Sequence, residues 1–276
     1  MEYTKHIHLY FFYCDKGDLE VVKFLIRKGV DVESETQKVG NTPLIIACQS
    51  GYLDIVKFLV EFANANIETR NSKNYTPLIY ASEYGNIEIV KYLITKGADV
   101  NAYGIDNYTP LIYACDRNYV EIAKILVNEG SNVNYDRYKQ GDTPLRIASW
   151  KGYLDIVKIL VESGFANVDT KYPHGTSPLS ESVRYGRLEV TKYPVEVAGA
   201  DIETRDEDGW TPLFWGSRYG NIEGIKFLIE SGANIDAINN YGQTFVEFLS
   251  DKYHDEIKRM MEDVQRRKGM IKPNRK

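Results

Sequence analysis

One tripeptide returns along this chain at a nearly constant interval. Thr-Pro-Leu begins at Thr42, Thr76, Thr109, Thr143 and Thr211, Ser177-Pro178-Leu179 fills the gap in the series, and Thr244-Phe245-Val246 is a degenerate last copy. The steps between these starts are 34, 33, 34, 34, 34 and 33 residues. A fixed period of this length is typical of repeat architectures, in which each unit buries its apolar face only against its neighbours. The chain is therefore expected to fold as a stack of similar units.

Each copy has the pattern of two short helices joined by a tight turn. The threonine hydroxyl can cap a helix start, and proline is tolerated in the first helical turn. Apolar residues at helical spacing follow, as in Leu53, Ile55, Val56, Phe58 and Leu59. A small residue comes three positions after the leucine in four copies (Ala47, Ala81, Ala114 and Ala148), and most copies end in Gly-Ala or Gly-Ser. Glycine in the left-handed conformation commonly ends a helix, so each copy is expected to contain a helix, a tight turn and a second helix that the glycine ends.

This pattern resembles the ankyrin repeat over almost the whole chain. The resemblance implies an all-α fold, an ankyrin-repeat solenoid of about eight helix-turn-helix units with β-hairpin-like loops. We expect one domain over residues 1–264, with an N-terminal cap at 1–36, six central repeats over about 37–238 and a C-terminal cap at 239–264, followed by a basic tail at 265–276. Polar caps are expected because the ends of an open stack would otherwise expose apolar surface.

The sequence departs from the family pattern at several positions. The histidine that usually follows Thr-Pro-Leu is replaced by Ile45, Ile79, Ile112, Arg146, Ser180 and Phe214. Asn64 stands where a glycine ends other copies, and asparagine tolerates the left-handed conformation. Pro194 stands where neighbouring copies carry leucine. Because an interior proline costs a helix roughly 3 kcal/mol, we predict that its unit is the least stable one. The proline is either a tolerated kink or a functional hinge.

The cysteines and histidines do not predict chemistry. Cys14, Cys48 and Cys115 occupy one repeat position, where equivalent residues lie roughly 8–10 Å apart, beyond the ~7 Å limit of a disulfide. They are expected to be small buried residues. The four histidines do not cluster, and the chain lacks a phosphate loop, a His-Glu-x-x-His motif and a nucleophile elbow. We therefore predict no catalytic residues, no metal and no cofactor.

Composition and charge limit the classes of protein to which the chain can belong. Hydrophobic residues make up 43% and charged residues 26%, which is typical of a folded globular chain. No segment approaches the ~18 consecutive apolar residues of a membrane span, and the start lacks a signal-peptide pattern. The net charge of −5 favours neither nucleic acid nor anionic membranes. We expect an intracellular, cytoplasmic monomer. The basic tail leaves one alternative, a nuclear or nucleic-acid-associated regulator.

The family resemblance implies a concave face, lined by hairpin tips and first helices, where a partner protein docks. Its variable positions are Lys73, Tyr75, Glu83, Tyr84, Asp106, Tyr108, Asp116, Arg117, Lys139, Gln140, Asp142, Trp150, Lys151, His174, Arg184, Tyr185, Glu207, Asp208, Trp210, Arg218 and Tyr219. Tyr, Trp and Arg are the types enriched at interface hot spots. The alternative is that tyrosine is simply abundant, since Tyr80, Tyr92 and Tyr113 fall at packing positions. The sequence thus predicts a protein-binding scaffold or adaptor rather than an enzyme.

Overall fold

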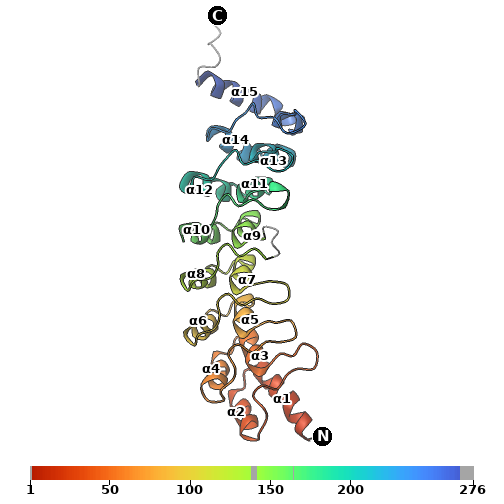
Figure 1. The fold of residues 1–276 in the computed structure, drawn as a ribbon, viewed down its shortest axis with the longest axis vertical. Helices are drawn as coiled ribbons and strands as arrows, with labels where there is room; N and C mark the ends of the chain where they lie inside the picture. Colours follow the sequence, from red (N-terminus) through yellow and green to blue (C-terminus); the bar gives the residue numbers. More distant parts are fainter. Residues whose placement is uncertain (1, 138–141, 164, 268–276) are drawn as a thin grey trace, which may run out of the picture. The chain divides into compact units, whose positions relative to one another are not determined.

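The computed structural model describes residues 2–137, 142–163 and 165–267 (Figure 1). Helices follow one another in pairs, and the described residues contain no β-strand apart from an isolated bridge between Ile238 and Thr244. The all-α repeat fold predicted from the period is therefore confirmed. None of the described helices is long and apolar enough to cross a membrane. The chain separates into two compact units, residues 1–133 and residues 134–276.

Unit 1 contains four helix pairs. They are α1 (Glu2–Lys16) with α2 (Leu19–Arg27), α3 (Pro43–Ser50) with α4 (Leu53–Glu61), α5 (Pro77–Glu83) with α6 (Ile87–Thr95), and α7 (Pro110–Arg117) with α8 (Val120–Asn128). Within each repeat the two helices pack on one another. The first helices α1, α3, α5 and α7 also pack in succession, as do the second helices α2, α4, α6 and α8.

Unit 2 continues the same arrangement and ends in a longer helix. It contains α9 (Pro144–Lys151), α10 (Leu154–Glu162), the 3-10 turn η1 (Pro173–Gly175), α11 (Pro178–Arg184), α12 (Leu188–Ala198), α13 (Pro212–Tyr219), α14 (Ile222–Glu230), the 3-10 turn η2 (Phe245–Phe248) and α15 (Asp251–Arg267). Helix α15 packs on α14, and Phe245 and Ile257 join the apolar core of this unit. The first residues of the predicted basic tail at 265–276 belong to α15, which ends at Arg267, and residues 268–276 lie outside the described residues.

The predicted caps and stops explain where the short helices begin and end. The Thr76 hydroxyl accepts the backbone N–H of Ile79 at 3.4 Å, and the equivalent bond forms at Thr42, Thr109, Thr143 and Ser177. Thr211 makes no such side-chain bond. Asn64 has a φ of 56°, which confirms the left-handed conformation predicted for it.

Small residues let successive helices approach closely. The alanine of the Thr-Pro-Leu-x-x-Ala motif is fully buried in each of the four copies, at Ala47, Ala81, Ala114 and Ala148. The neighbouring position holds the cysteines, all three of which are free and buried in unit 1. The prediction that they do not form a disulfide is confirmed. Burial raises the pKa of all three thiols, so they remain protonated and unreactive while unit 1 is folded.

Acidic and amide side chains connect each loop to the next. In unit 1 the Glu68 carboxylate accepts the backbone N–H of Asp99 at 2.9 Å. In unit 2 the Glu203 carboxylate accepts that of Asn234 at 2.6 Å. Hydrogen bonds to charged groups are stronger than those between neutral groups. These contacts hold neighbouring loops in register, which positions the residues at the loop tips.

The predicted limits of a domain at 1–264, with caps at 1–36 and 239–264, remain a prediction. The structure adds that contacts are denser within residues 1–133 and within residues 134–276. Each unit has a face formed by its loop tips and by the C-terminal ends of its first helices. This surface is called the hairpin face of that unit below.

Candidate functional site: the hairpin faces

The loop tips are closed like short β-hairpins. In unit 1 the backbone N–H of Asn71 donates to the carbonyl of Tyr75 at 3.2 Å, and in unit 2 that of Asp206 donates to the carbonyl of Trp210 at 3.1 Å. Neighbouring tips are joined as well, since the N–H of Ile105 donates to the Lys73 carbonyl at 2.8 Å. Within each unit the tips therefore form a hydrogen-bonded row that presents its side chains at fixed spacing.

A tyrosine cluster supports the hairpin face of unit 1. Tyr75, Tyr80 and Tyr113 are all buried, with Tyr75 only 8% exposed. The Tyr75 hydroxyl donates to the Asp106 carboxylate at 2.6 Å and accepts from the Tyr113 hydroxyl at 3.1 Å. Tyr75 meets the Tyr80 and Tyr113 rings edge to face. Tyr75 and Asp106, two of the predicted partner-binding residues, thus belong to an internal network.

The buried tyrosines should make unit 1 sensitive to alkali. Burial, followed by the hydrogen bond to Tyr75, raises the pKa of Tyr113 above its ordinary value of 10.0. Because the folded state holds this proton more tightly than the unfolded chain, the stabilisation is complete below pH 10 and is lost as the pH rises above it. At pH 11 the loss is expected to be on the order of 1 kcal/mol for Tyr113.

Thermal unfolding of the wild type and of Tyr113→Phe, followed by circular dichroism at pH 9 and pH 11, tests this expectation. The variant lacks the titrating hydroxyl, so it should lose less stability than the wild type between the two pH values. Equal losses in the two proteins would show that Tyr113 does not contribute to the alkaline sensitivity.

The outer layer of this face carries charged and aromatic side chains. Tyr84 is 48% exposed, stacks on the buried Tyr80 ring and accepts a hydrogen bond from Gln49 at 3.1 Å. Arg117 lies 3.7 Å from Glu83, and burial raises the pKa of that carboxyl. Lys73 is exposed, whereas Tyr108 and Asp116 are partly buried. The structure therefore brings together Tyr84, Glu83 and Arg117 as a mixed aromatic and charged surface.

The hairpin face of unit 2 is organised around one arginine. The Arg184 guanidinium lies over three rings, 5.3 Å from the Tyr185 centroid, 5.0 Å from that of Trp215 and 4.9 Å from that of Tyr219. Tyr185 also meets the Trp150 ring at 5.8 Å. Cation–π contacts of this kind hold both partners in place at modest exposure. The predicted residues Trp150, Arg184, Tyr185 and Tyr219 are thus brought into one connected cluster.

The other predicted residues of unit 2 have varied surroundings. Asp142 accepts from Arg146 at 3.0 Å, and Lys151 lies over the Trp150 ring. Trp210 packs against Phe248 and the core instead of standing free. His174 is exposed and 3.5 Å from Glu207, Asp208 accepts from the Tyr241 hydroxyl at 2.8 Å, and Arg218 is exposed. Lys139 and Gln140 lie outside the described residues.

A polar pocket opens in the hairpin face of unit 2, and half of its lining residues, Arg146, Thr176, Glu181, Asp206 and Trp215, are not among those predicted. It has a volume of about 580 Å³ and is lined by Asp142, Arg146, His174, Thr176, Glu181, Arg184, Asp206, Glu207, Asp208 and Trp215. Glu181 is 4% exposed, which is rare for a carboxylate. Comparing repeat positions could have found it, because the equivalent residues are Ile46, Tyr80, Tyr113, Ile147 and Trp215.

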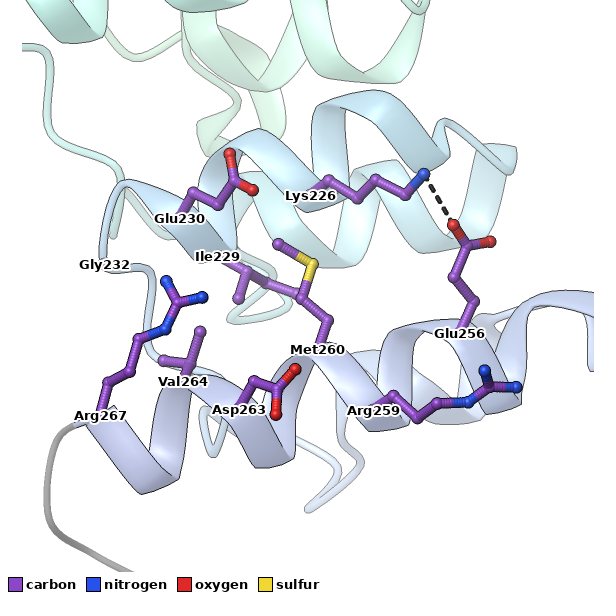
Figure 2. Close-up of a pocket in the computed structure, with 10 residues that line it drawn as sticks. All are labelled: Lys226, Ile229, Glu230, Gly232, Glu256, Arg259, Met260, Asp263, Val264 and Arg267. Carbon is purple, nitrogen blue, oxygen red and sulfur yellow. Dashed lines mark ion pairs between the residues drawn. The ribbon is translucent and has the colours of Figure 1, made fainter.

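A second pocket of about 520 Å³ lies between α14 and α15 (Figure 2). Met260 and Val264 of α15 point toward Ile229 of α14, and an ion pair of 2.7 Å joins Lys226 to Glu256 at one end (Figure 2). The long last helix leaves this gap where it covers the final repeat. Its charged groups are of both signs, so it favours packing of the cap over recognition of a particular ligand.

The described residues offer no metal centre. No group of three or more His, Cys, Asp or Glu side chains within residues 2–137, 142–163 and 165–267 is arranged to hold an ion. The polar groups of both hairpin faces instead contact one another and the solvent. The aromatic rings, guanidinium groups and carboxylates of these faces are groups that can bind a partner.

Comparison with known proteins agrees with the repeat pattern. A family model described as ankyrin repeats in three copies matches residues 10–104, 102–172 and 164–239. The human ASB11 ankyrin repeat domain is similar in structure, with a TM-score of 0.71, 24% sequence identity, and coverage of 80% of this chain and 98% of that one. At that identity the likeness shows the fold alone. No curated protein matches the chain. The resemblance seen in the repeat motifs is confirmed.

Proposed function

The chain belongs to the ankyrin-repeat family, and we propose that it is a non-catalytic scaffold or adaptor that presents its hairpin faces to a partner protein. Ankyrin repeats are in general protein–protein interaction modules, and the same scaffold holds unrelated partners by varying its surface residues. The single observation that carries the proposal is the set of half-exposed rings on both hairpin faces. Tyr84, Tyr185 and Tyr219 are 48%, 44% and 51% exposed.

These rings are held in place before any partner binds. Tyr84 stacks on Tyr80 in unit 1, whereas Tyr219 stacks on Trp215 and on the Arg184 guanidinium in unit 2. A rigid aromatic side chain loses little conformational entropy when it is buried by a partner. Such pre-organised Tyr, Trp and Arg side chains are typical of interface hot spots. The predicted partner-binding residues that meet this description are Tyr84, Trp150, Arg184, Tyr185 and Tyr219.

Alanine substitutions on the two faces test the proposal. Partners captured by the wild-type chain are identified, and their affinities for Tyr84→Ala, Trp150→Ala and Tyr219→Ala are measured by titration calorimetry. A hot-spot residue is expected to cost ~2 kcal/mol or more, about a 30-fold loss of affinity. The folds should stay intact, because substitutions of half-exposed residues usually change stability by less than ~1 kcal/mol.

Phe62→Ala is the matched control. Phe62 is 74% exposed and stands at the end of α4, away from the loop tips. Its removal deletes a ring that is more exposed than Tyr84 or Tyr219 and should leave partner affinity unchanged. If all three hairpin-face variants bind as tightly as the wild type, or if Phe62→Ala weakens binding equally, the proposed docking surface is wrong.

A further inference from the structure

The polar pocket of unit 2 contains a residue, Glu181, that differs in kind from the residues at the equivalent position of the other repeats. At the fourth position after the capping residue, the other repeats place Ile46, Tyr80, Tyr113, Ile147 and Trp215, whereas this repeat places Glu181. Glu181 therefore places a carboxylate in the pocket lining at a position where the other repeats carry apolar or aromatic side chains. Since burying a carboxylate is unfavourable, the substitution does not serve the stability of the fold.

The charge of Glu181 is only loosely compensated. Its Oε1 accepts from the Thr176 hydroxyl at 3.2 Å, and the nearest cation, Arg146, lies 3.9 Å away. Arg146 is closer to Asp142, with which it forms a hydrogen bond of 3.0 Å. The buried Glu181 carboxylate therefore lines the pocket with only one long ion pair, to an arginine that it shares with Asp142.

A second carboxylate faces the same space. The Asp206 carboxylate accepts the indole N–H of Trp215 at 3.1 Å and the backbone N–H groups of Trp210 and Asp208 at 2.8 and 3.0 Å. These neutral donors fix its orientation, but no ion pair to a cation forms within the described residues. Burial raises the pKa of Asp206 despite these hydrogen bonds. A cation entering the pocket would relieve that unfavourable burial.

The lining as a whole carries excess negative charge. Its five carboxylates are Asp142, Glu181, Asp206, Glu207 and Asp208, and its two guanidinium groups are Arg146 and Arg184, which leaves an excess of three negative charges. Arg146 is paired with Asp142, and Arg184 lies over the rings of Trp215 and Tyr219. The remaining four carboxylates therefore set the sign of the potential inside the pocket.

We propose that this pocket receives an arginine side chain of the partner protein. The inference rests on the proposed scaffold function and adds the chemistry of one recognised residue. A guanidinium presents five N–H donors in a planar fork, which suits several carboxylates that converge on one space. The Trp215 ring at the pocket wall adds an aromatic surface of the kind on which guanidinium groups stack. Glu181 and Asp206 are the residues that bind the incoming charge.

A small probe tests the pocket without knowledge of the partner. N-acetyl-arginine methylamide is titrated into the full chain, and the indole N–H signal of Trp215 is followed by NMR, because that N–H donates to Asp206. We expect a saturable shift with a dissociation constant in the millimolar range, about that of a single side chain. The citrulline analogue, which is neutral and nearly isosteric, and the glutamate analogue should bind at least tenfold more weakly. The lysine analogue should be intermediate.

Two substitutions give the matched comparison. Glu181→Gln keeps the shape and the Thr176 contact but removes the buried charge, and it should weaken the arginine probe about tenfold. Asp155→Asn removes an equal charge from an exposed position on α10 outside the pocket and should have no effect. Equal shifts with citrulline, preferred binding of the glutamate analogue, or an unchanged affinity in Glu181→Gln would each overturn the proposal.

Affinity measurements with a captured partner distinguish a failure of the pocket inference from a failure of the scaffold function. If a captured partner loses affinity with both Tyr219→Ala and Glu181→Gln, and arginine-to-lysine changes in the partner reproduce the loss, the pocket is assigned correctly. If Tyr219→Ala weakens binding and Glu181→Gln does not, the pocket inference fails while the scaffold function stands. If neither substitution changes affinity, the hairpin face of unit 2 is not the docking surface and the pocket inference fails, while the scaffold function is then decided by Tyr84→Ala in unit 1.

Discussion

Replacing Pro194 with leucine is expected to raise the free energy of unfolding of unit 2 by about 3 kcal/mol. Pro194 is buried inside α12, which spans Leu188–Ala198. Proline has no N–H to donate to the carbonyl of Val190, four residues earlier, so the helix loses one hydrogen bond. The equivalent residues of the helices that pack on α12 are Leu160 and Leu228, and both are fully buried. Leucine at position 194 should restore both the hydrogen bond and this apolar contact.

Tryptophan fluorescence during urea unfolding measures this effect on unit 2 alone, because Trp150, Trp210 and Trp215 all lie within residues 134–276. A gain of about 3 kcal/mol corresponds to a melting temperature roughly 6–12 °C higher for a unit of this size. Val197→Leu, at a 61% exposed position of the same helix, should change stability little. An unchanged or lower stability in Pro194→Leu would mean that the surrounding helices have closed around the smaller ring, so that leucine no longer fits.

The repeat period made most of the fold predictable. The spacing of Thr-Pro-Leu and Ser-Pro-Leu predicts where the first helices after α1 begin, and the observed helices begin at Pro43, Pro77, Pro110, Pro144, Pro178 and Pro212. This accuracy has a physical cause, since capping and the proline ring act locally and require no knowledge of distant contacts. The two compact units were not predicted, because the density of contacts depends on packing that a periodic pattern leaves nearly uniform.

The binding surface was less predictable, because a repeat position fixes where a residue stands but not where its side chain points. Trp210 and Tyr84 were assigned to the same surface on this basis. In the structure Trp210 packs against Phe248 and the core of unit 2, whereas Tyr84 remains half-exposed. The repeat pattern does not predict Glu181 for the opposite reason. Glu181 stands at a packing position, and its buried charge becomes evident only by comparison with the equivalent residues of the other repeats.

Tyr75 illustrates the same limit and leads to a second large expected effect. Tyr75→Ala should destabilise unit 1 by about 3–4 kcal/mol, because removing a buried aromatic ring leaves a cavity. The substitution also removes one hydrogen-bond partner from the Asp106 carboxylate and one from the Tyr113 hydroxyl. The ring lies against Gly104, where an added methyl group would stand 1.8 Å from it. The Tyr75 ring therefore occupies space that is free only because residue 104 has no side chain.

Comparison with two other substitutions separates the ring from the hydroxyl and from a surface role. Tyr75→Phe keeps the ring and loses the hydroxyl that donates to Asp106 at 2.6 Å and accepts from Tyr113 at 3.1 Å, so it should cost about 1.5–3 kcal/mol, the range for hydrogen bonds to charged groups. Tyr84→Ala removes a half-exposed ring and should cost less than ~1 kcal/mol.

Cys14, Cys48 and Cys115 are buried and all lie in unit 1, so the rate at which a thiol reagent labels them in urea reports the unfolding of this unit. If Tyr75→Ala stays as resistant to labelling as Tyr84→Ala, the buried network does not support the hairpin face, and Tyr75 returns to the set of candidate partner contacts.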